Sequence, residues 1–90
     1  PYESLATAFR GRKADPFVGT IEPLEGDLRH NPNNYSGQEF DYVLEGTLEI
    51  LIGNKELILN PGDSIYFDAQ QKHCMRALGG KPVKFLCVVI

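Results

Sequence analysis

Residues 36–46 read SGQEFDYVLEG, a turn followed by a stretch with the composition of a β-strand. The Ser-Gly pair favours a turn, and the aromatic and β-branched residues in 39–45 are typical of a strand. Gly46 ends the strand and leads into the next apolar stretch. Glu39 stands where the strand begins, so the direction in which this carboxylate points becomes the first question about function.

The chain after Gly46 continues as short strands separated by turns. Residues 47–52 and 55–59 flank Gly53-Asn54, a two-residue connection typical of a tight β-hairpin. Over 47–52, Leu48, Ile50 and Ile52 alternate with Thr47, Glu49 and Leu51, which gives this strand one apolar face and one mixed face. Further strands are predicted at 64–67, 73–78 and 83–90, separated by turns or loops at 60–63, 68–72 and 79–82.

The first 35 residues give weaker signals. Residues 17–24 are predicted as a strand and 27–30 as a second, weaker strand, followed by a loop at 31–34. The nearest candidate for a helix is 4–9, SLATAF, which is short and equally compatible with an extended chain. Residues 1–16 are predicted to be a lead-in or linker remnant, and residues 17–90 a single domain. Seven or eight short strands, roughly ten residues apart, indicate an all-β sandwich or small barrel.

Composition and charge exclude several classes of protein. The chain has 90 residues and a net charge of −3, which argues against direct binding to nucleic acid because phosphate contacts need a basic face. No apolar run approaches the roughly 20 residues of a membrane span. Cys74 and Cys87 are too few for a disulfide framework and are predicted to be free, buried thiols, which favours a cytoplasmic location. A domain this short gains from a partner subunit, and a homodimer is expected.

Two glycine-bearing motifs resemble those of the cupin family. The first cupin motif is G(X)5HXH(X)3,4E(X)6G, and Glu39 and Gly46 have the spacing of its second half. The second motif is G(X)5PXG(X)2H(X)3N, and Gly62 and His73 have its spacing. Fifteen residues separate Gly46 from Gly62, as in small bacterial cupins. The resemblance covers about residues 18–90 and implies a single antiparallel jelly-roll barrel, also called a double-stranded β-helix.

The same motifs depart from the family at the positions that bind metal. Metal-binding cupins use the two histidines of HXH, the glutamate and the second-motif histidine. In this chain Asn33 and Tyr35 stand at the two HXH positions, so only Glu39 and His73 remain of that set. Zinc, iron and similar ions need three or four protein ligands. We therefore expect no bound metal and no other cofactor.

The residues of both motifs, SGQEFDYVLEG at 36–46 and PGDSIYFD at 61–68, also resemble those of the C-terminal sensor domains of bacterial XRE-type transcriptional regulators. In those proteins a helix-turn-helix domain contacts DNA, and the cupin domain binds a small-molecule effector and dimerises. The resemblance implies that this chain is such a domain, that its DNA-binding domain lies outside the sequence, and that it binds neither DNA nor membranes directly.

The residues expected to contact the effector are Tyr35, Gln38, Glu39, His73 and Met75. Register with the cupin motifs implies that Glu39 and His73 face the barrel interior, and the two-residue period of a strand places Met75 on the same face as His73. Exposed positions are the alternative for Glu39 and Tyr35. No residue is identified as catalytic, and whether the protein is an enzyme stays open, although the loss of HXH favours a non-enzyme. The alternative is a stand-alone metal-dependent cupin enzyme, such as a dioxygenase, isomerase or lyase.

Overall fold

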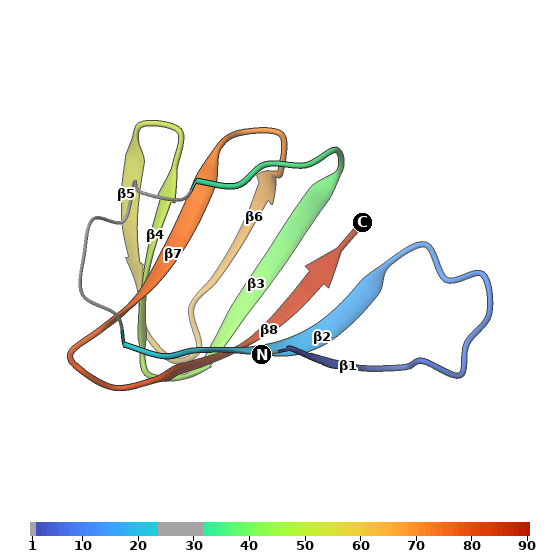
Figure 1. Ribbon diagram of the computed structural model, residues 1–90, viewed down its shortest axis with the longest axis horizontal. Coiled ribbons are helices and arrows are strands. Elements are labelled where there is room, and N and C mark those ends of the chain that lie inside the picture. The colour runs from blue at the N-terminus through green and yellow to red at the C-terminus, as the bar shows by residue number, and fades with distance from the viewer. Residues whose placement is uncertain (1, 24–31) are drawn as a thin grey trace.

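The computed structural model describes residues 2–23 and 32–90, and within these ranges all helix or strand structure is β-strand (Figure 1). The strands are β1 (Tyr2–Ser4), β2 (Asp15–Ile21), β3 (Gln38–Glu45), β4 (Thr47–Ile52), β5 (Lys55–Leu59), β6 (Ser64–Asp68), β7 (His73–Leu78) and β8 (Val83–Val89). The all-β prediction is confirmed, and β4 and β5 have the predicted bounds. No helix capable of spanning a membrane occurs among the described residues.

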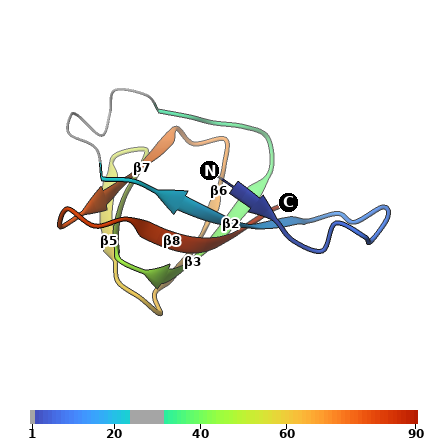
Figure 2. The same cartoon turned by 60° about the horizontal axis from the view of Figure 1, so that its bottom comes forward.

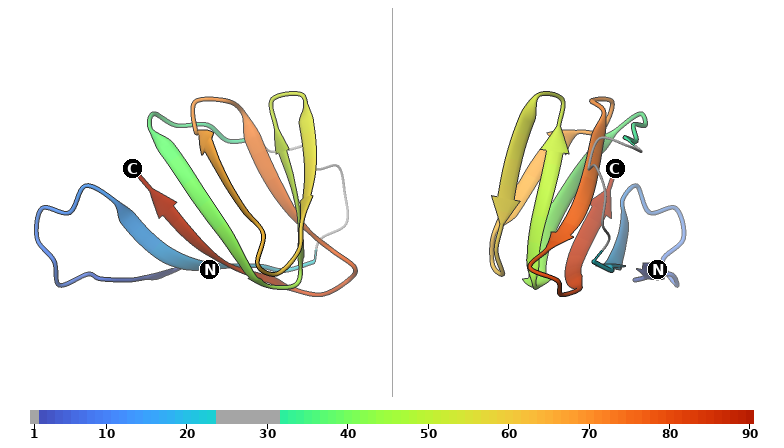
Figure 3. Two further views of the ribbon diagram at one scale, coloured as in Figure 1. Left: turned by 180° about the vertical axis from the view of Figure 1, so that it is seen from behind. Right: turned by 60° about the vertical axis from the view of Figure 1, so that its left-hand side comes forward.

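The strands form two antiparallel sheets that face each other (Figures 1 and 3). The larger sheet has the order β1-β2-β8-β3-β6, and the smaller one has the order β5-β4-β7. Because β3 belongs to the larger sheet and β4 to the smaller one, the chain changes sheets at Gly46. In the larger sheet the three central strands are β2, β8 and β3, and β8 lies between the other two and pairs with both in antiparallel fashion.

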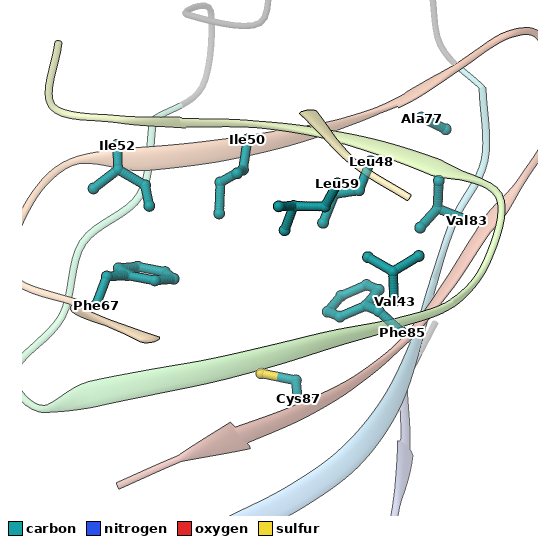
Figure 4. Close-up of a cluster of buried hydrophobic side chains, with 10 residues drawn as sticks. All are labelled: Val43, Leu48, Ile50, Ile52, Leu59, Phe67, Ala77, Val83, Phe85 and Cys87. Atoms are coloured by element: carbon teal, nitrogen blue, oxygen red, sulfur yellow. The ribbon is translucent and has the colours of Figure 1, made fainter. Parts of the chain in front are cut away.

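The hydrophobic core lies between the sheets and follows from the alternation along the strands. On β4, Leu48, Ile50 and Ile52 point inward and are buried. Figure 4 shows the side chains of β4 and β5 facing those of β3, β6 and β8. The buried cluster consists of Val43, Leu48, Ile50, Ile52, Leu59, Phe67, Ala77, Val83, Phe85 and Cys87. This packing leaves the first part of β3 as the stretch where polar side chains enter the interior.

The N-terminal region differs from the prediction. Residues 2–4, predicted as lead-in, form β1, which pairs with β2 beside the barrel (Figure 2). No local pattern predicted this strand, because all three of its residues are exposed and it depends on pairing with β2. The ring of Tyr2 contacts that of Phe17 with centroids 4.9 Å apart. β2 begins and ends earlier than the predicted strand 17–24, and the weak strand predicted at 27–30 lies outside the described residues.

Candidate functional site

The segment before β3 is fastened across one end of the barrel by backbone hydrogen bonds. The Asn33 N–H donates to the carbonyl of His73 at 2.7 Å, and the His73 N–H donates back to Asn33 at 2.8 Å. The Tyr35 N–H donates to the carbonyl of Ala69 at 2.9 Å. Asn33, which stands at the first histidine position of the cupin motif, therefore forms a backbone bridge to His73. The backbone of Tyr35 is held by Ala69 at the same end of the barrel.

Tyr35, Glu39 and His73 come together at this end and form what we call the Tyr-Glu-His group. The hydroxyl of Tyr35 donates to Oε1 of Glu39. Nε2 of His73 lies 3.8 Å from the same Oε1, and the rings of Tyr35 and His73 meet edge to face with centroids 5.6 Å apart. Glu39 and His73 are each only 5% exposed, whereas Tyr35 is half-buried. Tyr35 therefore lies between the two buried groups and the surface.

The orientation of the His73 ring is set by two neighbours. Its Nδ1 lies 2.8 Å from the carbonyl oxygen of Gln71, and a carbonyl can only accept, so Nδ1 carries the hydrogen. The ring of Phe67 packs against it edge to face at 4.9 Å. In the neutral imidazole the lone pair of Nε2 then faces the carboxylate of Glu39. Two acceptors facing each other favour a proton donor or a cation between them.

A second set of polar groups lies deeper in the barrel, and we call Glu39, Asp41 and Cys87 the inner cluster. Asp41 is two residues after Glu39 on β3 and therefore shares its face. Cys87 is the register partner of Asp41 on β8. One ligand atom from each of the three side chains lies within 4.8 Å of the others. Asp41 is 0% exposed, and among the described residues its oxygens have no hydrogen-bond partner apart from its two neighbours in this cluster.

Burial dominates the electrostatics of these groups. Burial, and then the neighbouring Glu39, raise the pKa of Asp41 to about 9. The pKa of the Cys87 thiol also lies well above its ordinary value, because of burial and then the nearby Asp41 and Glu39. Burial and the hydrogen bond to Glu39 raise the pKa of Tyr35. At neutral pH, Asp41, Cys87 and Tyr35 therefore all retain their protons.

The other two predicted contact residues lie apart from the Tyr-Glu-His group. Met75 is two residues beyond His73 on β7, pairs with Ile50 and packs against the hydrophobic core. Gln38 is exposed, and its side-chain oxygen accepts a hydrogen bond from the hydroxyl of Tyr66. Since Glu39 is buried and its neighbour Gln38 is exposed, the alternation of β3 directs the Gln38 side chain away from the interior.

The sequence analysis did not select Asp41 and Cys87 as functional residues. The signal for Asp41 was available, since the two-residue period puts it on the face of Glu39, but a charged residue in a strand is normally exposed. Both cysteines were predicted to be buried thiols outside any disulfide. Neither forms a disulfide; Cys87 is buried as predicted, but Cys74 is only half-buried. Nothing in the apolar sequence of 83–90 indicated that Cys87 would lie beside a carboxylate.

We expect Tyr35→Phe to lower the free energy of unfolding by about 1–3 kcal/mol, because the buried Glu39 loses its hydrogen-bond donor while the ring packing is kept. Tyr66→Phe is the matched control: it also removes a hydroxyl that donates to a side-chain oxygen, but Tyr66 is exposed and the cost should stay below about 0.5 kcal/mol. Urea denaturation of the three proteins measures both values. Equal costs would mean that the Tyr35 hydroxyl is as well hydrated as that of Tyr66.

Comparison with known proteins gives a curated relative in sequence and many solved structures with a similar fold. Protein MJ1618 of Methanocaldococcus jannaschii, an uncharacterised protein, is 32% identical over 54 residues, which are 60% of this chain and 43% of that protein. The cupin domain of an XRE-family transcriptional regulator from Enterobacter cloacae superposes with a TM-score of 0.81 at 24% identity, covering 99% of this chain and 93% of that one. The structure of Fe(II)-HppE with an alternative substrate superposes with a TM-score of 0.74 at 26% identity, covering 86% of this chain and 42% of that one.

The sequence itself matches the cupin domain family, Cupin_2, over residues 17–89. This match spans β2 to β8 and includes both motif glycines, Glu39 and His73. Together with the two facing antiparallel sheets, it establishes that the chain belongs to the cupin family.

Proposed function

We propose that this chain is the effector-binding and dimerising domain of a bacterial XRE-type transcriptional regulator. The observation that carries the proposal is the Tyr-Glu-His group, in which a carboxylate and an imidazole are buried at one end of the barrel. Buried polar groups are costly unless they are satisfied, and they mark binding sites in concave, mostly apolar interiors. A polar effector that donates to Glu39 or to Nε2 of His73 would meet this need, with Met75 as part of the apolar wall.

Entry of such an effector would involve Tyr35. Its half-buried ring covers both Glu39 and His73, and its hydroxyl occupies Oε1 of Glu39. An effector that replaces this hydroxyl would release the segment before β3. The resulting change would reach a helix-turn-helix domain elsewhere in the parent protein, which would contact DNA within the cytoplasm. Such a switch requires that the effector bind one conformation more tightly than the other.

The outer face of the larger sheet supports the dimer. Register pairs Phe40 with Val88, and Tyr42 with Leu86, which in turn pairs with Val18. These five apolar side chains share one face because they alternate with the inward residues of the same strands. Tyr42 is 37% exposed. A contiguous apolar sheet face of this kind fits a second copy of the domain better than it fits water.

A metal-dependent enzyme is the second candidate, because Glu39 and His73 match the family's ligand positions and Fe(II)-HppE has a similar fold. The residues of this chain do not fit the family's metal. Asn33 contributes a backbone bridge to His73, and Tyr35 donates its hydroxyl proton to Glu39. Two remaining ligands are fewer than the three or four that such ions need. The geometry therefore favours the effector-binding domain.

Native mass spectrometry of the domain purified from a bacterial cytoplasm tests this proposal. We expect a dimer that carries a small molecule released on denaturation, and we expect Glu39→Gln to lose that molecule. Glu45→Gln, the same change at the exposed end of β3, is the matched control and should keep it. A monomer without any small molecule in the parent and in both variants would contradict the proposal.

A further inference from the structure

The strongest unexplained feature of the interior is Asp41. It is 0% exposed, and among the described residues its oxygens have no hydrogen-bond partner outside the inner cluster itself, where Glu39 and Cys87 are its neighbours. A buried carboxyl group without a partner costs several kcal/mol, by order of magnitude, compared with an apolar residue of similar size. A domain this small has little stability to spare. An unsatisfied group in such a place is the expected sign of a bound ion or ligand that completes its contacts.

The neighbours of Asp41 are metal ligands by type. Glu39 and Cys87, both at most 5% exposed, turn their side chains toward it. All three ligand atoms lie within 4.8 Å of one another. Two ligands at roughly 2.0–2.3 Å from one tetrahedral zinc ion are about 3.3–3.8 Å apart, so side-chain movements of up to about 1.5 Å bring the three atoms into one coordination sphere. We propose that Glu39, Asp41 and Cys87 together bind one divalent transition-metal ion inside the barrel.

The ligand types narrow the choice of metal. A thiolate with two carboxylates suits zinc, cobalt or ferrous iron, whereas calcium and magnesium require a shell of oxygen ligands. Three protein ligands leave a position open for a water molecule or an effector atom, as at zinc sites that do chemistry. The ion neutralises two of the three negative charges carried by the deprotonated ligands.

This site differs from the metal position of the family. The family's ligands lie at positions 33, 35, 39 and 73, and only Glu39 is common to both sets. Asp41 and Cys87 lie farther along β3 and β8, and Cys87 is part of the hydrophobic core. The ion therefore binds below the Tyr-Glu-His group. The inference rests on Asp41 and Cys87 and stands whether or not an effector binds above.

Cobalt(II) titration of the chelator-treated chain tests the proposal directly, because a thiolate on cobalt gives a sulfur-to-metal charge-transfer band in the near ultraviolet. We expect the band to saturate at one cobalt per chain. Cys87→Ser should abolish it, and Cys74→Ser is the matched control that should retain it. Asp41→Asn should weaken cobalt binding by at least about tenfold. Zinc should displace cobalt and remove the band.

A loss of cobalt binding in Asp41→Asn will not be due to unfolding. The substitution removes a destabilising group, so the variant should fold at least as well as the metal-free parent. Circular dichroism of each variant checks this. The absence of a band in the parent would overturn the proposal. Binding that survives Cys87→Ser and Asp41→Asn but is lost in His73→Ala would also overturn it, since the ion would then sit at the family's position.

Discussion

Asp41→Asn is expected to flatten the pH dependence of stability in chelator-treated protein and to make it more stable than the parent at about pH 8. The pKa of Asp41 in the folded chain is raised to about 9, against about 3.9 in an unfolded chain. Between these values the folded state holds a proton that the unfolded chain has released. The free energy of unfolding therefore falls as pH rises, by at most about 1.4 kcal/mol per pH unit for this one group.

The sign of this effect distinguishes Asp41 from an ordinary carboxylate. The stabilising contribution of the Asp41 proton is complete below the pKa that Asp41 has in the unfolded chain. It is lost as pH rises toward the pKa that Asp41 has in the folded chain. The titratable groups that face it are Glu39 and Cys87, with Tyr35 and His73 beyond Glu39. Asparagine mimics the protonated acid at every pH, so the slope contributed by Asp41 disappears in the variant.

Urea denaturation at a series of pH values from about 5 to 8, with chelator present, measures the slope. Asp68→Asn, at the exposed end of β6, is the matched control and should leave the slope unchanged. If the parent and Asp41→Asn show the same slope, the folded chain does not hold the extra proton, and burial has not raised the pKa of Asp41.

Gly46→Ala is expected to cost considerably more stability than Gly62→Ala, although both glycines have similar backbone angles. Gly46 has φ of +83° and Gly62 has φ of +90°, so alanine at either site is strained by about 1–2 kcal/mol. A Cβ on Gly46 would lie 2.4 Å from the carbonyl oxygen of Pro82, whereas a Cβ on Gly62 would meet nothing within 4 Å. The backbone contact should add about 1–3 kcal/mol at Gly46.

Urea denaturation at one pH compares the two variants, and the difference between them isolates the close approach at the corner where the chain changes sheets. A loss of similar size in both would show that the turn before β8 moves aside at little cost. A larger loss in Gly62→Ala would contradict the packing at both turns.

The strands were predictable where local chemistry sets them. Gly53-Asn54 fixes the hairpin of β4 and β5, and alternation over residues 47–52 fixes the face that β4 buries. β1 was not predictable, because residues 2–4 have no apolar face and become a strand only by pairing with residues 17–19. Local signals therefore sufficed inside the barrel and failed where a strand depends on a distant partner.

The candidate site was likewise predictable only in part. Motif spacing indicated Glu39 and His73, and the structure brings them within 3.8 Å. Gln38 was predicted to contact the effector through its side-chain amide, but it is exposed and accepts a hydrogen bond from Tyr66, because neighbouring residues of a strand point in opposite directions. Asp41 and Cys87 become neighbours only through the register of β3 with β8. The sequence does not encode that register in any short motif, so the inner cluster appears only in three dimensions.

The place of β8 in the larger sheet has a consequence for biosynthesis. The ribosome makes β2 and β3 early, yet β8 lies between them. Until residue 89 has left the exit tunnel, both strands have an unpaired edge toward the gap, and edges of this kind attract other chains. The nascent domain must therefore wait for β8 before it can close, and the time before β8 emerges is the period of greatest need for a chaperone.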